Sequence, residues 1–286
     1  MISYVSDGSR GRYPPPARQA TRTGAAILRD VKLGYDRNMA IRDLTSERLF
    51  VNDDLAAGAA IEIEPEQAHY LTNVLRLRPG ARLLVFNGRD GEWVASLLEV
   101  RKRGAKLGLE HQTRAQEQGP DIDYLFAPLK RSRLDYMVQK ATEMGVSRLQ
   151  PVITQRTIAE RVNTDRMRAN VIEAAEQCGI LRVPEVAPPV SLDAALADWD
   201  ARRKLIYCDE HDTDAGPVEA LNRTPRGPLA VLIGPEGGFS ERERERLLAL
   251  PFVVPLSLGP RIMRADTAAV AVLALVNAVL GDWRRH

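Results

Sequence analysis

Two glycine-rich segments in the last quarter of the chain carry the residues best suited to chemistry. The first spans residues 234–238 and includes one carboxylate; the second spans residues 259–267 and includes two arginines and one carboxylate. Glycine lets a backbone approach a ligand closely and adopt dihedral angles that other residues avoid. Guanidinium groups can stabilise negative charge that develops on a substrate, and a carboxylate can accept a proton. The charged residues of the two segments are Glu236, Arg261, Arg264 and Asp266.

Simpler interpretations of these segments stay open at this stage. A strand followed by Gly-Pro-Glu-Gly-Gly can be only a tight turn. The two acids can cap helix ends or pair with Arg261 or Arg264. Two nucleotide-binding motifs are not matched, because no lysine and hydroxyl pair follows the glycines and no G-x-G-x-x-G stands at a first strand.

Each segment follows a short apolar run that predicts a strand, over residues 229–233 and 252–258. Ser240 with Glu243 three residues later predicts a capped helix start after the first segment. In open α/β sheets, ligands bind at the carboxyl ends of strands, where both segments lie. Residues 268–280 are apolar on nearly every side but too few to span a bilayer, so they predict a packed helix.

The order of strand and helix patterns predicts the domain organisation. Strands and helices alternate from Tyr124 onward, which predicts an α/β domain with a parallel sheet over residues 120–286. Closely spaced short strands with turn dipeptides predict a small β-barrel domain over residues 44–115. The polar stretch from Gln112 to Pro120 is the predicted linker.

Residues 1–43 lack hydrophobic periodicity and are rich in arginine and proline, so we expect a disordered extension there. They contain no apolar core of a signal peptide, and several aspartates argue against a transit peptide. We favour Met39 as the natural start of the protein.

Composition limits the possible partners. The formal net charge is only +2, so any affinity for nucleic acid must come from local patches. The two cysteines and four histidines are scattered singly and match no metal motif, so we predict no metal centre. The small number of cysteines fits reduced thiols and a cytoplasmic protein, and no membrane segment is predicted.

The two glycine-rich segments, with their flanking residues, closely resemble paired motifs of the RsmE family. Residues 233–240 read Ile-Gly-Pro-Glu-Gly-Gly-Phe-Ser, and residues 258–268 read Leu-Gly-Pro-Arg-Ile-Met-Arg-Ala-Asp-Thr-Ala. Residues 69–80 are similar to a segment of the family's amino-terminal domain. The chain departs from the family pattern at Met263, where leucine is usual, at Asp266, where glutamate is usual, and at Ile180, where arginine is expected.

The RsmE family comprises SPOUT-class enzymes that methylate N3 of a uridine in 16S ribosomal RNA of the small subunit. The resemblance implies a trefoil-knotted methyltransferase domain, a PUA-like RNA-binding barrel, S-adenosylmethionine as cofactor, and a homodimer to which the closing helix contributes. It also implies that the knotted loops hold the cofactor, largely through backbone groups. The residues expected there are Ile233, Gly234, Pro235, Gly237, Gly238, Leu256, Ser257, Leu258, Gly259, Ile262, Met263 and Thr267.

The implied reaction assigns roles to the charged residues. N3 of uracil carries a proton and is weakly nucleophilic while neutral, so methylation requires loss of that proton while negative charge spreads onto the ring oxygens. An arginine can stabilise this charge and an acid can accept the proton. We assign the first role to Arg264 and name Glu236 and Asp266 as candidates for the second.

Basic residues in both predicted domains are candidates for contacts with RNA phosphates. For any single one of them, a solvated surface residue remains the alternative. Two other functions also stay open: a SPOUT methyltransferase acting on another RNA nucleotide, and a non-catalytic RNA-binding protein of ribosome assembly. The candidate RNA contacts are Arg48, Arg76, Arg78, Lys130, Arg156 and Arg261.

Overall fold

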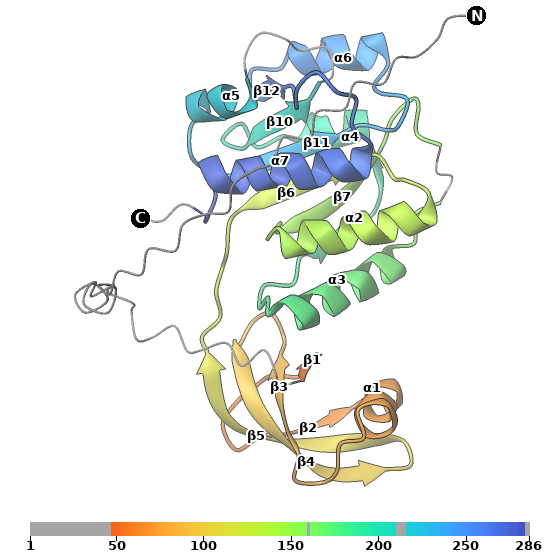
Figure 1. Cartoon of the computed structure of the whole chain (residues 1–286), viewed down its shortest axis with the longest axis vertical. Coiled ribbons are helices and arrows are strands. Elements are labelled where there is room, and N and C mark those ends of the chain that lie inside the picture. Colours follow the sequence, from red (N-terminus) through yellow and green to blue (C-terminus); the bar gives the residue numbers. More distant parts are fainter. Residues whose placement is uncertain (1–46, 159–160, 210–215, 284–286) are drawn as a thin grey trace, which may run out of the picture. The chain divides into compact units, whose positions relative to one another are not determined.

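A computed structural model describes residues 47–158, 161–209 and 216–283. The predicted extension over residues 1–43 lies outside these ranges. Within the described residues, the strands form a five-stranded sheet near the amino-terminal end and a seven-stranded sheet in the rest of the chain (Figure 1).

The five-stranded sheet has the order β1-β3-β4-β5-β2. Its β1 pairs with β3 in parallel, and the other neighbours are antiparallel. Apolar residues on one face, such as Leu83, Leu97 and Leu107, are fully buried in a common core. The strands are β1 (Arg48–Phe50), β2 (Ala60–Ile63), β3 (Arg82–Phe86), β4 (Glu92–Arg101) and β5 (Gly104–Arg114).

A short helical segment covers this core. It consists of α1 (Pro65–His69), which continues directly into a π-helical turn, η1 (Tyr70–Val74). Ala68 and Leu71 are its buried residues and join the core of the sheet.

The polar stretch predicted as a linker is partly a strand. β5 continues to Arg114 because its ladder with β4 extends as far as the pairing of Arg114 with Glu92. The predicted linker start at Gln112 was therefore wrong, and the segment without regular structure covers residues 115–121.

The seven-stranded sheet has the order β12-β10-β11-β6-β7-β8, with β9 also pairing with β7. Every pair is parallel, so the carboxyl ends of its strands share one edge. The prediction of an α/β domain with a parallel sheet is confirmed. The strands are β6 (Ile122–Phe126), β7 (Arg148–Ile153), β8 (Glu185–Val186), β9 (Val190–Ser191), β10 (Lys204–Cys208), β11 (Leu229–Ile233) and β12 (Val253–Leu256).

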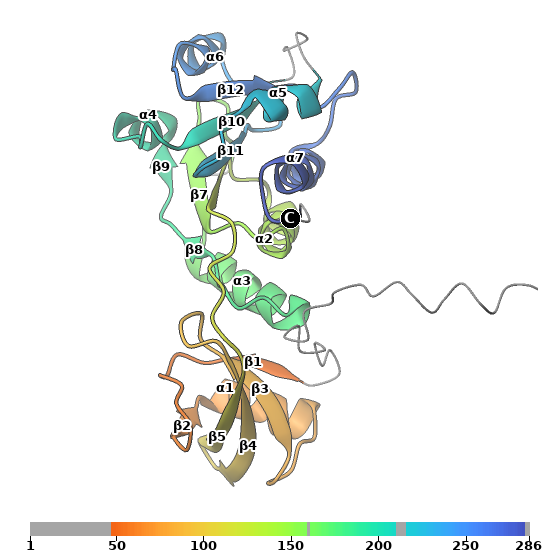
Figure 2. The same ribbon diagram turned by 90° about the vertical axis from the view of Figure 1, so that its left-hand side faces the viewer.

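Helices cover both faces of the parallel sheet (Figure 2). α2 (Arg131–Glu143), α3 (Thr164–Cys178), α5 (Pro217–Arg223) and α7 (Ala265–Val279) share a core with β6 and β11. α4 (Leu192–Ala197) and α6 (Glu241–Leu248) contribute to the core of the opposite face. The strands are buried on both faces, which explains their nearly continuous apolar sequences.

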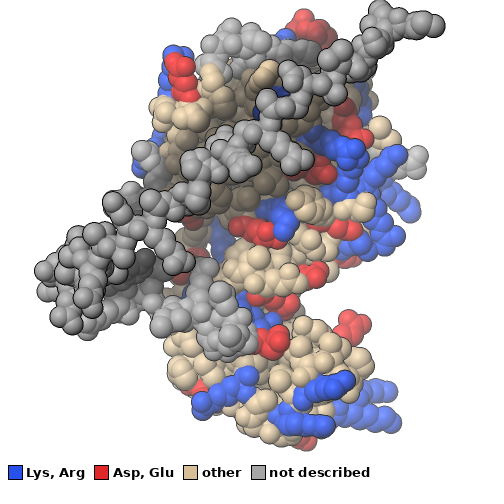
Figure 3. All heavy atoms as spheres, in the orientation of Figure 1, with Lys and Arg blue, Asp and Glu red and all other residues tan. Residues whose placement is uncertain are grey.

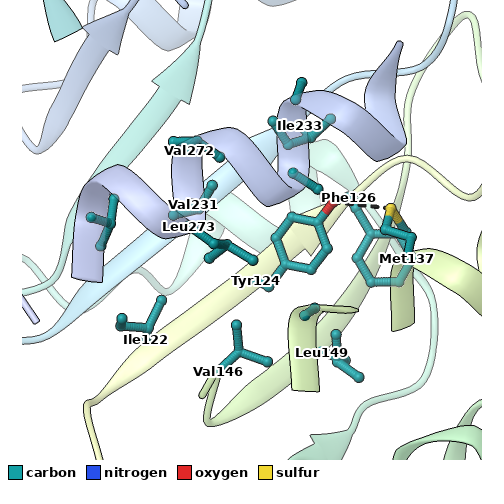
Figure 4. Packing of buried hydrophobic residues seen from close by; sticks show 14 of the residues in the cluster. Ile122, Tyr124, Phe126, Met137, Val146, Leu149, Val231, Ile233, Val272 and Leu273 are labelled. Atoms are coloured by element: carbon teal, nitrogen blue, oxygen red, sulfur yellow. Dashed lines mark hydrogen bonds between the residues drawn. The ribbon is translucent and has the colours of Figure 1, made fainter. Parts of the chain in front are cut away.

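The larger core is built around aromatic residues of β6. Tyr124 and Phe126 stack with ring centroids 5.1 Å apart, between residues of α2 and α7 (Figure 4). The Tyr124 hydroxyl lies 3.0 Å from the sulfur of Met137 and donates to it, so its polar group is satisfied within the core. This packing anchors α7 against the sheet beside the carboxyl ends of the strands.

The closing helix matches its prediction closely. α7 begins three residues before the predicted start at residue 268, with Arg264 as its N-cap residue. No helix in the described part of the chain is both long enough and apolar enough to cross a membrane.

Candidate functional site

A cavity of about 610 Å³ opens at the carboxyl ends of β10, β11 and β12. Both glycine-rich segments border it, because β10 lies between β11 and β12 in the parallel sheet. Three of the predicted residues in these segments do not line the cavity: Gly237, Asp266 and Thr267. The predicted residues that do line it are Ile233, Gly234, Pro235, Glu236, Gly238, Leu256, Ser257, Leu258, Gly259, Arg261, Ile262, Met263 and Arg264, together with Arg156.

The turn after β11 needs glycine at Gly234 for a packing reason. A Cβ atom placed on Gly234 would come within 2.6 Å of the Phe239 ring. That ring packs edge-on against Tyr207 at the end of β10, with ring centroids 5.3 Å apart. Gly238, with φ of 68°, completes the turn into α6. The absence of a side chain at Gly234 therefore lets Phe239 close one side of the cavity.

The predicted capping box at the start of α6 is confirmed. Ser240 accepts a hydrogen bond from the Glu243 amide, and the Glu243 carboxylate accepts one from the Ser240 amide. The same carboxylate also accepts from the Gln155 amide at 2.8 Å, in the loop after β7. In that loop, Arg156 donates to the Gly237 carbonyl at 2.8 Å. The loop after β7 therefore also holds the glycine-rich turn in place through these hydrogen bonds.

The second segment leaves β12 earlier than predicted. The strand ends at Leu256, so Ser257 and Leu258 belong to the loop that borders the cavity. Gly259 has φ of 102°, in the region that favours glycine. Arg264 is exposed at the start of α7, and the exposed fraction of Ile262 reaches 92%. This loop presents backbone groups, an apolar side chain and two arginines, Arg261 and Arg264, at one edge of the cavity.

The acids of the two segments have local partners. Glu236 accepts a hydrogen bond from Arg133 of α2, which is neither of the arginines considered from the sequence. Both side chains of this ion pair are partly exposed, so its contribution to stability is small, about 0–1 kcal/mol. The Asp266 carboxylate accepts from the Thr267 amide at 3.0 Å. Of the two acids, only Glu236 lines the cavity.

Residues that the sequence analysis did not select also line the cavity. Asp209 is buried just after β10, and the Arg244 guanidinium of α6 donates to its carboxylate at 3.0 Å. This hydrogen bond is the main cause of the raised pKa of Arg244. Burial raises the pKa of the neighbouring Cys208 thiol to about 12, so this thiol stays protonated at neutral pH. Asp209 could have been selected from its place directly after an apolar strand.

The described residues contain no group of three or more His, Cys, Asp or Glu side chains placed to hold a metal ion.

Comparison with known proteins matches both parts of the chain. Residues 116–277 match a family described as an RNA methyltransferase domain, and residues 63–110 match one described as an RNA methyltransferase PUA domain. A ribosomal RNA small subunit methyltransferase E from Synechocystis sp. is 30% identical over 237 residues, which cover 82% of this chain and 78% of that protein. The chain belongs to the ribosomal RNA small subunit methyltransferase E family. The family member from Rickettsia conorii is 29% identical over 236 residues, covering 80% of this chain and 94% of that protein.

Solved structures agree with this assignment to the methyltransferase E family. A ribosomal RNA small subunit methyltransferase E from Neisseria gonorrhoeae, bound to S-adenosylmethionine, has a TM-score of 0.77 and 26% identity, and the match covers 84% of this chain and 100% of that chain. A putative methyltransferase from Legionella pneumophila, also in complex with S-adenosylmethionine, has a TM-score of 0.74 and 30% identity, over 83% and 99% of the two chains. The predicted resemblance and fold class are confirmed, apart from the knot.

Arg48 lies in a different environment from the one predicted. Its side chain is only 7% exposed, and it donates to Glu92 of β4 at 2.9 Å. The same guanidinium donates to carbonyls at the carboxyl end of α3, those of Ala175, Glu176 and Ile180. Arg48 therefore has no face available for an RNA phosphate. A buried guanidinium requires hydrogen-bond partners, and Arg48 finds them on Glu92 and α3. Arg48 therefore links the five-stranded sheet to α3.

The segment after α3 joins the same contact. Arg114 of β5 donates to the carbonyl of Gly179, the left-handed residue that ends α3. The Glu176 carboxylate accepts from the Phe50 amide at 2.8 Å. Arg182 donates to the Pro120 carbonyl at 3.0 Å, in the connecting segment. These hydrogen bonds thus join the two sheets, while Ile180, at the position where arginine is expected, packs in the same contact.

The remaining predicted RNA contacts are exposed. Arg76 and Arg78 follow η1, and Arg76 has φ of 59°, a left-handed conformation that is costly for a residue other than glycine. Lys130 is the N-cap residue of α2. Arg156 and Arg261 lie at the cavity described above.

Proposed function

We propose that this protein transfers a methyl group from S-adenosylmethionine to N3 of a uridine in 16S ribosomal RNA of the small ribosomal subunit. The observation that carries the proposal is that both motifs of the methyltransferase E family line one cavity, at the carboxyl ends of β11 and β12 on either side of β10. Two similar structures bound to S-adenosylmethionine support the choice of cofactor.

The residues of the cavity fit this cofactor. A volume of about 610 Å³ lies within the usual range of ligand pockets, about 300–1,000 Å³. A Cβ atom at Gly259 would meet no atom within 4 Å, so no protein atom crowds the backbone there. Ile233, Leu256 and Met263 offer apolar contacts for a flat base, and Glu236 offers a carboxylate for a positive group. When bound, S-adenosylmethionine supplies an electrophilic methyl group on a sulfonium.

The chain's own residues would prepare the uracil. Arg264 would stabilise negative charge on the ring oxygens when N3 loses its proton, a role supported by its exposed position at the cavity. Glu236 is a better candidate than Asp266 for accepting that proton, because its carboxylate lines the cavity. Arg133 orients the Glu236 carboxylate through their ion pair.

The proposal includes the organisation of the molecule. We assign residues 44–115 to an RNA-binding domain and residues 120–286 to a methyltransferase domain whose loops form a trefoil knot. We also propose a homodimer formed with α7, whose residues Val270, Ala271 and Ala274 are apolar and only half-buried in the single chain. We further propose that the substrate is the assembled small subunit and that the protein acts in the cytoplasm.

Methyl transfer to small subunits that lack their native modification tests the proposal directly. Labelled S-adenosylmethionine is used as the donor, and nucleosides are analysed after digestion. We expect labelled 3-methyluridine with the wild-type protein and a loss of at least about 100-fold in rate with Arg264→Ala, because charge stabilisation of this kind contributes two to three orders of magnitude. Arg202→Ala, which removes an exposed arginine outside the cavity, is the matched control and should leave the rate unchanged.

The other outcomes separate the alternatives. A different labelled nucleoside would assign the enzyme to another RNA position. Cofactor binding without any transfer to small subunits or naked RNA would favour a non-catalytic RNA-binding protein.

A further inference from the structure

A second cavity lies on the other side of the glycine-rich turn. Its volume is about 510 Å³, and it is lined by the first turns of α2 and α3. Pro235 and Glu236 line both this cavity and the first one. The turn after β11 therefore separates the first cavity from the second and lines both.

The rim of the second cavity is basic. Lys130, Arg131, Arg161 and Arg166 line it, against the carboxylates of Asp135 and Glu236. Figure 3 shows lysine and arginine side chains gathered over the ends of α2 and α3 that carry these residues. Because the formal charge of the whole chain is only +2, this local excess is the kind of patch that nucleic acid binding requires.

The start of α2 adds to the attraction for an anion. Lys130 is its N-cap residue, no side chain caps the helix, and its first turn has no acidic residue. Unpaired amides at the start of a helix and the helix dipole both favour a negative group. The helix has 13 residues, and the cavity beside its first turn gives such a group a place to bind.

The guanidinium groups differ in how firmly they are held. Arg166 donates to both oxygens of Asp135, at 2.8 and 2.6 Å, so its position is set by the protein. Arg131 is exposed and forms no ion pair within the residues that the structure describes. One guanidinium that is paired with a carboxylate and one without an ion pair among the described residues thus line the same cavity.

The wall of the second cavity is apolar. Leu129, Leu134 and Met167 are buried residues that line it, and Ile158 lies at its edge with an exposed fraction of 68%. A basic rim with an apolar wall matches a nucleotide, whose phosphate is anionic and whose base has an apolar face.

We propose that the second cavity binds a nucleotide of the substrate RNA next to the methylated uridine, with its phosphodiester at Arg131 and Arg166 and its base against the apolar wall. This inference rests on the proposed function, because it places the RNA strand beside the turn that carries Glu236. It adds Arg131 and Arg166 to the RNA contacts and gives Lys130 a position at the same site.

The test measures binding of unmodified small subunits to the full-length protein over a range of salt concentrations. Arg131→Ala should weaken binding about five- to tenfold and reduce the slope of log affinity against log salt by about 0.7–0.9, the loss of one phosphate contact. Arg166→Ala should act in the same direction. Affinity for S-adenosylmethionine, measured by titration without RNA, should stay unchanged in both variants, which a general loss of folding would not allow. Arg202→Ala serves as the control for removal of an exposed arginine.

Wild-type affinity and salt dependence in both Arg131→Ala and Arg166→Ala would overturn the inference. That result would leave the proposed function untouched, because the proposed function is tested separately, by whether the wild-type protein forms 3-methyluridine. If the wild-type protein forms no 3-methyluridine but both variants lose RNA affinity, the second cavity remains an RNA site of a protein with a different activity.

Discussion

Gly234 shows at the scale of one residue how packing governs the site. Its missing side chain makes room for the Phe239 ring, which in turn packs on Tyr207 beside buried Asp209. From its sequence context alone, this glycine is expected to allow close approach of a ligand. The structure adds that a Cβ atom would first meet a protein ring rather than the ligand.

We predict that Gly234→Ala weakens S-adenosylmethionine binding at least tenfold, because Phe239 or the turn must move into the cavity. Overpacking of this kind also costs about 1–3 kcal/mol of folding free energy. Isothermal titration with the cofactor and urea unfolding measure the two effects. Gly216→Ala is the matched control, since a Cβ atom at Gly216 meets nothing within 4 Å. Equal cofactor affinity in both variants would show that Phe239 does not need the space.

The carboxyl end of α3 is the element that joins the two sheets. Its last carbonyls accept hydrogen bonds from Arg48 and Arg114, two arginines of the five-stranded sheet. Glu92 lies beside both, at 2.9 Å from Arg48 and 3.7 Å from Arg114. Basic groups at the carboxyl end of a helix also interact favourably with its dipole. Burial makes this arrangement sensitive to the loss of any one partner.

We predict that Arg48→Ala lowers the free energy of unfolding by about 3–5 kcal/mol, because it leaves the buried Glu92 carboxylate without its closest partner. Arg82→Ala, which removes an arginine with a 70% exposed side chain from its pair with Glu110, should cost less than about 1 kcal/mol. Urea unfolding followed by circular dichroism measures both. A similar small cost in the two variants would mean that the buried pair contributes no more than a surface one.

The whole molecule is proposed to act as a dimer through α7. One side of this helix, with Val272, Leu273 and Val276, is fully buried against the sheet. The opposite side carries Val270, Ala271 and Ala274, which are only half-buried in the single chain. An apolar helix of this kind is more stable when a second surface covers it.

We predict that Ala274→Glu converts the dimer to a monomer, since a buried carboxylate without a partner is costly at an apolar interface. Size-exclusion chromatography with light scattering gives the mass in solution. Ala169→Glu, at an exposed position of α3, introduces the same charge elsewhere and should leave the mass unchanged. A monomeric wild-type protein, or a dimeric Ala274→Glu variant, would contradict the proposed interface.

Local sequence was sufficient to predict the helices and strands and the segments that form the cavity. The apolar runs of β11 and β12, the Ser240 capping box and the helix after Arg264 are all properties of neighbouring residues, and the structure has them close to the predicted places. Parallel pairing of alternating strands then brings both glycine-rich segments to one edge of the sheet. Tertiary structure alone decided contacts between residues far apart in the chain. Arg48 meets α3 rather than solvent, Glu236 pairs with Arg133, and Arg131 and Arg166 come together at the second cavity, because each depends on how complete helices and sheets pack.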